Sequence, residues 1–363
     1  MFPPMAALSR FVVLSLAVAA SGCAATTAPA PPPEERLVVV NAGENTVALI
    51  PVEPIRPTRK VLLGPLEGAA VDVAARGERA IVAGGTSDLV VVVDLRLEQV
   101  ERTIELPVGS RPIAVTMISE TIGYVANAGT NTVTRIDLAT GDTASVAVGV
   151  FPRDLLLARG FLFIVNGNVE VCGDTLCPIG PSWLTVVDPK NNARAAGRDS
   201  IPLPTQGQAI SIAIDGFGLL YVLNTGDLDA GIQGRLSIVD PIRREEVGSF
   251  GGFGLVPATA ISDGAERLFV TSTEDGLMEF NTRTRRVVRG SGSGIFVSDN
   301  RAAAIDSRGW IYAVEGSGCE QGLPGRLRIF RTDLTEARSI IVGVCPVAAT
   351  FVQLPGLAEA EGL

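Results

Sequence analysis

The chain has 363 residues with a formal net charge of −9, and its 40 glycines and 23 prolines supply many turns. The negative charge argues against nucleic acid as a partner and against a basic face that docks on membranes. The chain contains no histidine, which excludes Ser-His-Asp and Cys-His catalytic arrangements and histidine-held metals.

The first residues are typical of an export signal. Arg10 precedes an apolar run at residues 11–20, which is shorter than the roughly 20 residues that a membrane-spanning helix needs. The following Ser21-Gly-Cys23 resembles the lipobox of bacterial lipoproteins. We therefore expect residues 1–22 to be a lipoprotein signal peptide and Cys23 to carry the lipid. The alternative is an ordinary signal peptide that is cut after an Ala-x-Ala-like site.

Residues 23–35 are expected to form a tether. They are rich in Ala, Thr and Pro and end in PPPEE, so they bury little apolar area and favour an extended chain. Ala24, rather than Asp, follows the cysteine, and by the same resemblance this favours the outer membrane. We expect an outer-membrane lipoprotein of the bacterial cell envelope, periplasmic or surface-facing, monomeric, and held to the membrane through its lipid only.

Residues 36–353 repeat one unit, which is clearest in the third copy. Strands are expected at 122–126, 133–136, 143–148 and 153–158, with a hairpin turn after Asn127 and an Asx-turn at Asp137. The segment Asn41-Ala-Gly-Glu-Asn-Thr-Val47 recurs as Asn127-Ala-Gly-Thr-Asn-Thr-Val133. Four strands in each unit of about 40–50 residues predict a β-propeller. Seven units fit between residues 36 and 352.

Tyr124-Val-Ala-Asn127, followed by Asn131-Thr-Val-Thr-Arg-Ile-Asp137 and Gly149-x-x-Pro152, resembles the YVTN-type β-propeller repeat of bacterial envelope proteins. The resemblance covers nearly all of residues 36–352 and implies an all-β, seven-bladed propeller. It is specific for the architecture and says almost nothing about a ligand.

The ends of the repeat region predict how the ring closes. Residues 36–41 match the second strand of a unit, so the innermost strand of blade one is expected from residues 346–352. Residues 354–363 then form a C-terminal tail. The inner strands are expected at 69–74, 113–118, 154–158, 209–214, 258–261, 302–305 and 347–351.

Three hairpins, at 166–182, 224–234 and 315–325, are much longer than the others and fall on one face. We expect this face to be a recognition surface; the alternative is neutral drift of loops that disulfides stabilise. Arg111 and Arg153, beside Gly-x-x-Pro turns, are expected near the mouth of the central channel, as an anion-attracting rim or as solvated arginines that pair with an acid such as Asp154. The polar candidates in the loops are Asn166, Glu170, Asp174, Asn224, Asp227, Asp229, Glu315 and Glu320.

Four cysteines follow Cys23, and an even number in an exported chain predicts disulfides. Cys172 and Cys177 share one loop, and Cys319 and Cys345 are expected on the same face, which favours these two pairs. We expect no metal site at the cysteines. Asn224-x-x-Asp227-x-Asp229 has calcium-like spacing, but Asp and Asn are also ordinary turn residues.

The sequence favours a binding or scaffold module whose partner is an envelope protein, a glycan or a small ligand. One alternative is an enzyme of the lactonase or quinoprotein-like propeller kind, although the His, Glu and Arg sites of such enzymes are not visible here. No catalytic residue and, apart from calcium, no cofactor is expected. The other alternative is a purely structural spacer. A deep axial pocket with converging charges would favour catalysis, and a broad face would favour docking.

Overall fold

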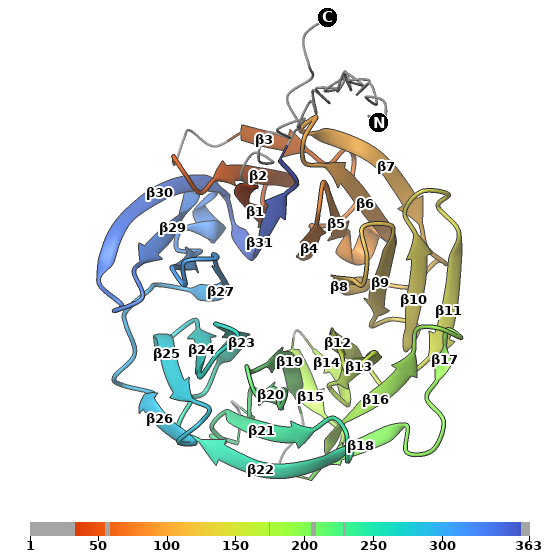
Figure 1. Cartoon of the computed structure of the whole chain (residues 1–363), viewed down its shortest axis with the longest axis vertical. Helices are drawn as coiled ribbons and strands as arrows, with labels where there is room; N and C mark the ends of the chain where they lie inside the picture. The colour runs from red at the N-terminus through yellow and green to blue at the C-terminus, as the bar shows by residue number, and fades with distance from the viewer. Residues whose placement is uncertain (1–32, 55–58, 174, 205–207, 228–229, 357–363) are drawn as a thin grey trace, which may run out of the picture. The chain divides into compact units, whose positions relative to one another are not determined.

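The computed structural model describes residues 33–356 except 55–58, 174, 205–207 and 228–229. These residues form seven antiparallel sheets arranged as blades around one axis, so the predicted seven-bladed β-propeller is confirmed (Figure 1). Residues 1–32, with the expected signal peptide and Cys23, lie outside the described part.

Each blade is a four-stranded meander. Blade one contains, from its outer to its inner strand, β3 (Arg59–Leu62), β2 (Thr46–Pro51), β1 (Glu34–Asn41) and β31 (Pro346–Leu354). From inner to outer strand, blade two contains β4 (Asp72–Arg76), β5 (Arg79–Ala83), β6 (Leu89–Asp94) and β7 (Gln99–Glu105), and blade three contains β8 (Pro112–Met117), β9 (Ile122–Asn127), β10 (Thr132–Asp137) and β11 (Thr143–Ala147). Blade four contains β12 (Pro152–Ala158), β13 (Phe161–Asn166) and β16 (Ser182–Asp188), with the outer pieces β17 (Ala193–Arg194) and β18 (Ser200–Leu203).

Blades five to seven follow the same order. Blade five contains β19 (Ala209–Ile214), β20 (Leu220–Asn224), β21 (Arg235–Asp240) and β22 (Glu245–Gly251). Blade six contains β23 (Pro257–Ser262), β24 (Arg267–Ser272), β25 (Gly276–Asn281) and β26 (Arg286–Arg289). Blade seven contains β27 (Asn300–Ile305), β28 (Ile311–Glu315), β29 (Pro324–Phe330) and β30 (Glu336–Val344). Outside the blades lie the hairpin of β14 (Val169–Cys172) and β15 (Thr175–Pro178) and two short 3-10 helices, η1 (Gly85–Ser87) and η2 (Cys319–Gln321).

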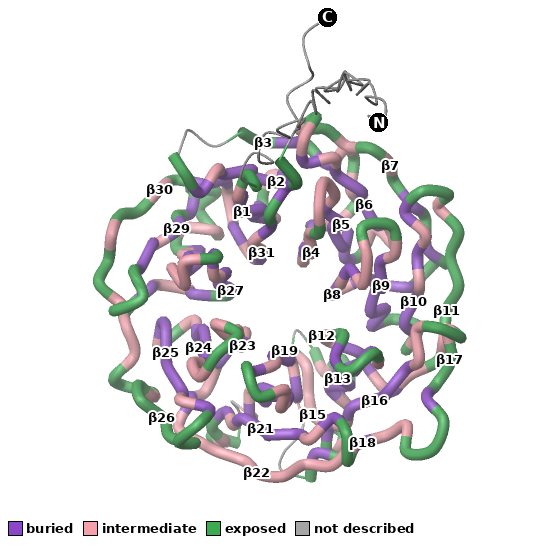
Figure 2. Tube along the Cα trace, viewed as in Figure 1, coloured by how far each residue is buried: buried purple, intermediate pink, exposed green. Residues whose placement is uncertain are grey.

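The core lies between neighbouring blades. The second strand of each blade is packed on both faces and reads as a mostly apolar run, as does the third strand of blade two; in β6, Val90–Val93 are all fully buried (Figure 2). Val38 of blade one and Val82 of blade two belong to one such inter-blade cluster. The outer strands have solvent on one side, and most residues of β11 are exposed.

Blade one is built from both ends of the described chain. Strand β1 pairs with β31 from Glu34 and Leu354 to Asn41 and Pro346, which confirms the predicted closure. The pairing continues beyond the strands, because Ala42 N–H donates to the Cys345 carbonyl at 2.8 Å. Closure leaves no free sheet edge at the junction.

Hairpin tips fasten each of the first three blades to the next one. Asn45, Asp88 and Asn131 all have a left-handed backbone, with φ of 48°, 54° and 56°. Their side-chain oxygens accept backbone N–H groups at the start of the following blade: Ala70 at 3.0 Å, Arg111 at 2.7 Å and Phe151 at 2.8 Å, respectively. The repeated Asn-Thr-Val segment is therefore an inter-blade contact as well as a turn.

The expected inner strand at residues 69–74 lies instead at Asp72–Arg76. The backbone of Ala70 is bound by the Asn45 side chain, so the residues before Val71 belong to the connection from blade one. The other inner strands lie within two or three residues of their expected bounds.

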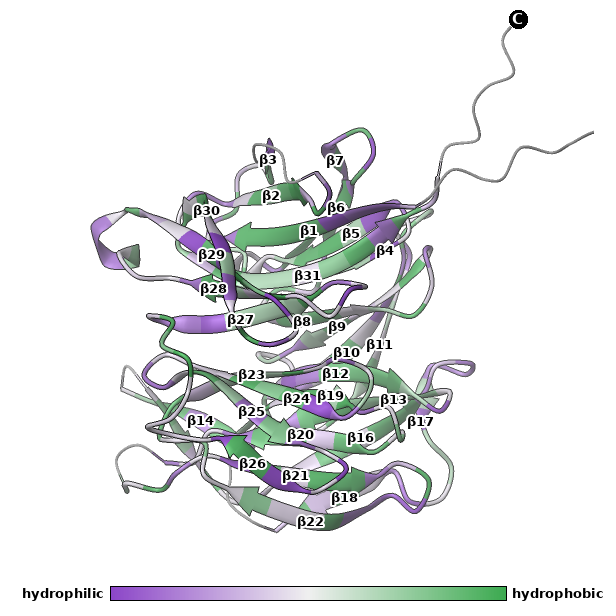
Figure 3. Ribbon diagram, turned by 60° about the vertical axis from the view of Figure 1, so that its left-hand side comes forward, coloured by the Kyte–Doolittle hydropathy of each residue, from purple (hydrophilic) through white to green (hydrophobic). Residues whose placement is uncertain are grey.

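The two faces of the propeller differ. We call the loop face the one that carries the hairpins between second and third strands and the connections between blades; the other is the opposite face. Strand β1 begins, and β31 ends, on the opposite face (Figure 3). In the described part of the chain, no helix has both the length and the apolar character to cross a bilayer.

Candidate binding face

A pocket of about 480 Å³ lies on the loop face between blades four and five. It is bounded by the β14–β15 hairpin, by the start of blade five and by the connection into blade six. Its lining is mixed, with Leu176, Pro178, Leu255 and Val256 as apolar members and Gln208, Thr225 and Asp227 as polar ones.

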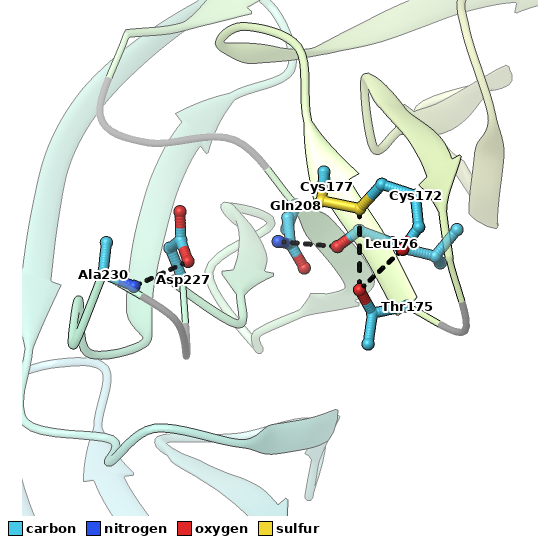
Figure 4. The surroundings of a disulfide bond; sticks show 7 residues. All are labelled: Cys172, Thr175, Leu176, Cys177, Gln208, Asp227 and Ala230. Atoms are coloured by element: carbon cyan, nitrogen blue, oxygen red, sulfur yellow. Dashed lines mark hydrogen bonds between the residues drawn. A yellow bond between two sulfur atoms is a disulfide. The ribbon is translucent and has the colours of Figure 1, made fainter.

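The wall from blade four is the β14–β15 hairpin, which is closed by the predicted disulfide between Cys172 and Cys177 (Figure 4). Asn168 Nδ2 donates to the Pro181 carbonyl at 2.9 Å and ties the base of the hairpin together. A cross-linked two-stranded ribbon loses less conformational freedom on binding than an open loop of the same length.

Gln208 connects the two sides of the pocket. It has φ of 67° and directly precedes the inner strand of blade five. Its Nε2 donates to the Leu176 carbonyl at 3.3 Å (Figure 4). Its Oε1 accepts from Thr225 Oγ1 at 3.2 Å. The sequence analysis did not identify this residue; its place matches Arg111 and Phe151, which also precede an inner strand with positive φ.

The third enlarged hairpin is fixed by the second predicted disulfide, between Cys319 and Cys345. Cys319 begins η2 in the blade-seven hairpin, and Cys345 lies between β30 and β31. Glu320 is exposed in this hairpin, whereas Glu315 pairs with Arg328 at 3.5 Å.

Large apolar side chains are exposed at the tips of this face. Val108 is 96% exposed and Phe296 is 70% exposed, both in connections between blades. The enlarged hairpins of blades four and seven add Val171, Ile179 and Leu323, each more than half exposed. At the loop tips these side chains are accessible to a binding partner.

Several sequence-predicted loop residues lie elsewhere than expected. Asn166 and Asn224 are fully buried, so they belong to the fold and not to the accessible surface. Asn166 accepts from Gly149 N–H at 2.9 Å and donates to Thr185 Oγ1 at 3.0 Å. Glu170 is exposed on the hairpin and Asp227 lines the pocket, whereas Asp174 and Asp229 lie outside the described residues.

Of the three residues with calcium-like spacing, Asn224 and Asp227 belong to the described part of the chain. Asn224 Nδ2 is directed into its own sheet, toward Ser237 Oγ at 3.3 Å, and Asp227 Oδ1 accepts from Ala230 N–H at 3.0 Å. Within the described ranges, no three acidic or cysteine side chains are grouped so that they could hold a metal ion.

A separate cavity of about 230 Å³ lies on the axis and is lined by the inner strands of all seven blades. Asp72 and Asp154 face it from blades two and four. Asp72 accepts from Val115 N–H and Asp154 from Ile212 N–H, both at 2.9 Å. Each carboxylate therefore connects its blade to the next one.

These two carboxyl groups are electrostatically unusual. Burial, and secondarily the charge of Asp154, raises the pKa of Asp72 to about 7. Burial raises the pKa of Asp154 to about 6, against the opposing effects of its backbone hydrogen bonds and of Arg153. Carboxyl groups with such pKa values exchange protons near neutral pH.

The two predicted channel-mouth arginines both lie near the Phe151 ring. The guanidinium carbons of Arg111 and Arg153 are 5.8 and 5.7 Å from the centre of the Phe151 ring. Arg153 also lines the axial cavity, where burial lowers its pKa to about 10. Its side chain thus forms part of the cavity wall beside Asp154.

No family model and no curated protein matches the sequence. Solved structures do match the fold. A protein of unknown function from Desulfotomaculum acetoxidans has a TM-score of 0.68 and 11% identity, with 88% of this chain and 99% of that chain covered. A quinoprotein alcohol dehydrogenase-like protein from Bacteroides thetaiotaomicron has a TM-score of 0.61, 12% identity, and coverage of 86% and 77%. Hydrazine synthase of Kuenenia stuttgartiensis has a TM-score of 0.57, 14% identity, and coverage of 73% and 77%. At these identities the likeness concerns the fold alone.

Proposed function

We propose that the chain is an exported, lipid-anchored β-propeller of the YVTN-repeat kind, whose loop face binds another protein of the bacterial cell envelope. The observation that carries the proposal is the partly apolar pocket beside a disulfide-closed hairpin on this face, together with exposed apolar side chains at the loop tips, from Val108 at 96% to Ile179 at 51% exposure. Protein interfaces are centred on such apolar contacts, and the pocket offers a place for one anchoring side chain.

The rigidity of the face supports this function. Disulfides close the hairpins of blades four and seven, and Gln208 fastens one of them to blade five. Loops that are already ordered lose little entropy on association. Disulfides also fit an oxidising, exported location.

The place of the first strand fits an anchored protein. Strand β1 begins on the opposite face, so an anchor ahead of it leaves the loop face free for a partner. An acylated Cys23 would supply that anchor. Labelling with radioactive palmitate tests it: the parent should be labelled, and Cys23→Ala should be released into the soluble fraction without label.

Affinity capture from envelope extract tests the docking claim with a matched pair of variants. The loop-face variant carries Val108→Ser, Phe296→Ser and Leu323→Ser. The control carries Leu97→Ser, Phe217→Ser and Ile242→Ser, which remove three exposed apolar side chains from the opposite face. A partner recovered by the parent and the control, and lost from the loop-face variant, supports the proposal. Equal recovery by all three refutes it, and a spacer without a partner would recover nothing specific.

An enzyme of the lactonase or quinoprotein-like kind is the second candidate, favoured by the converging charges of Arg153, Asp72 and Asp154 in the axial cavity. The axial cavity has a volume of about 230 Å³, which is smaller than the roughly 300–1,000 Å³ of most ligand pockets. Both carboxylates also hold the next blade, which explains them without catalysis. Hydrolysis of ester or lactone substrates by the parent, lost in Asp154→Asn, would favour the enzyme.

A further inference from the structure

A groove of about 860 Å³ lies on the opposite face, where blades one and seven meet. Blade one contributes Val52, Glu53 and Pro54, and blade seven contributes arginines around one tryptophan. The groove is distant in the fold from the loop face, because the turns that form it lie at the other ends of the strands.

Trp310 orders two of these arginines. The guanidinium carbon of Arg308 lies 4.3 Å from the centre of the indole ring, and that of Arg331 lies 5.6 Å from it. Such cation–π contacts hold a guanidinium group in place without neutralising its charge. Arg338, on β30, is exposed and lines the same groove.

The three arginines differ in how their charge is balanced. Arg308 pairs with the buried carboxylate of Asp306 at 2.6 Å and also with Glu53. Among the described residues, no acid forms an ion pair with Arg331 or Arg338. Arg331 donates instead to the neutral hydroxyl of Thr335, at 3.3 Å. Asp333 lies close enough to interact electrostatically with Arg331, without a direct ion pair. Arg331 and Arg338 therefore line the groove with guanidinium donors available to an anion.

We propose that this groove binds a small organic acid, with its carboxylate on Arg331 and Arg338 and its apolar body on Pro54 and Ala337. Guanidinium groups match a carboxylate with two parallel hydrogen bonds. The chain itself illustrates the chemistry, because the mostly exposed Glu53 carboxylate already binds Arg308 at the edge of the groove. The Glu53 carboxylate also repels an anionic ligand in the groove, so its removal is expected to strengthen binding.

Intrinsic fluorescence reports on the groove directly. The chain has two tryptophans, so Trp183→Phe leaves Trp310 as the only one. In this background, benzoate is titrated at constant ionic strength, with benzamide as the neutral control of the same shape. Benzoate is expected to give a saturable change in emission, and benzamide none over the same concentrations.

Charge variants decide the interpretation. Arg338→Gln is expected to weaken benzoate binding roughly fivefold or more, and Glu53→Gln to strengthen it roughly threefold. Both residues are exposed, and thermal melting of each variant checks that the fold is retained. Equal responses to benzoate and benzamide, or affinities that the two substitutions leave unchanged, would overturn the proposal. The loop-face variant should bind benzoate like the parent, so failure here is separate from failure of the proposed function.

Discussion

The backbone N–H of Gly343 donates to Asn41 Oδ1 at 2.9 Å, across 302 positions of the sequence. Asn41 ends the first strand of the propeller, and Gly343 lies in β30 just before the last strand. The same bond joins Gly149 N–H, in the connection that leaves blade three, to Asn166 Oδ1 of blade four. The ring is therefore closed with a hydrogen bond that also fastens one ordinary blade to the next.

Closure predicts that the last strand is essential. Deletion of residues 346–363 removes β31 and exposes the full length of β1 together with the apolar faces of blades one and seven. The truncated protein should be unfolded at 25 °C, as measured by circular dichroism and by protease resistance. Deletion of residues 357–363 is the control and should leave Tm unchanged. A folded 1–345 protein with the parental Tm would contradict the account.

The two disulfides should differ in their effect on stability. Cys319 and Cys345 are 26 residues apart and join the blade-seven hairpin to the closing junction. Replacing both by Ser should lower the free energy of unfolding by about 3 kcal/mol.

The disulfide between Cys172 and Cys177 lies in a hairpin outside the blades. Its loss should leave the global unfolding of the ring nearly unchanged and instead reduce partner binding. Denaturant titration measures the first effect and affinity capture the second. Equal destabilisation by both pairs of substitutions would show that the blade-four hairpin belongs to the cooperative unit.

The axial carboxyl groups predict a pH dependence of stability. Because burial raises the pKa of Asp72 to about 7, the folded state binds this proton more tightly than the unfolded state does. The stability that the protonated Asp72 gives to the folded state is fully present below the ordinary pKa near 4 and is lost as the pH rises through about 7. Asp72→Asn keeps an acceptor for Val115 N–H and removes the charge. The difference in the free energy of unfolding between Asp72→Asn and the parent should be more favourable to the variant at pH 8 than at pH 4, by on the order of 2 kcal/mol.

Urea denaturation of the parent and of Asp72→Asn at both pH values measures this difference. Asp137→Asn, at an exposed Asx-turn that accepts from Ala139 N–H, is the control and should show no such trend. A gain for Asp72→Asn that is equal at pH 4 and pH 8 would mean that the carboxyl is not desolvated.

The repeats were sufficient to predict the fold, because turn residues and apolar runs recur at a regular spacing and both depend on local backbone geometry. Asn131 could be predicted as a turn residue, since its side chain tolerates positive φ. Its bond to Phe151 N–H could not, because that contact depends on how the next blade is placed.

The candidate site was predicted less completely. The long hairpins and both disulfides followed from the lengths of the loops and the number of cysteines. Asn166 was expected on the surface because its loop is long, but it ends a strand and its side chain is satisfied inside the blade. The raised pKa of Asp72 arises from burial on the axis and, secondarily, from the charge of Asp154, and a single sequence carries no signal for either.

Photo-crosslinking in intact cells tests the docking of the loop face most directly. A photoreactive amino acid is placed at Phe296 or Leu323 on the loop face, and at Phe217 or Ile242 on the opposite face; all four positions are exposed. The account predicts a discrete protein adduct from Phe296 and Leu323 and none from the other two positions. Adducts from Phe217 and Ile242 alone, or from none of the four, would contradict it.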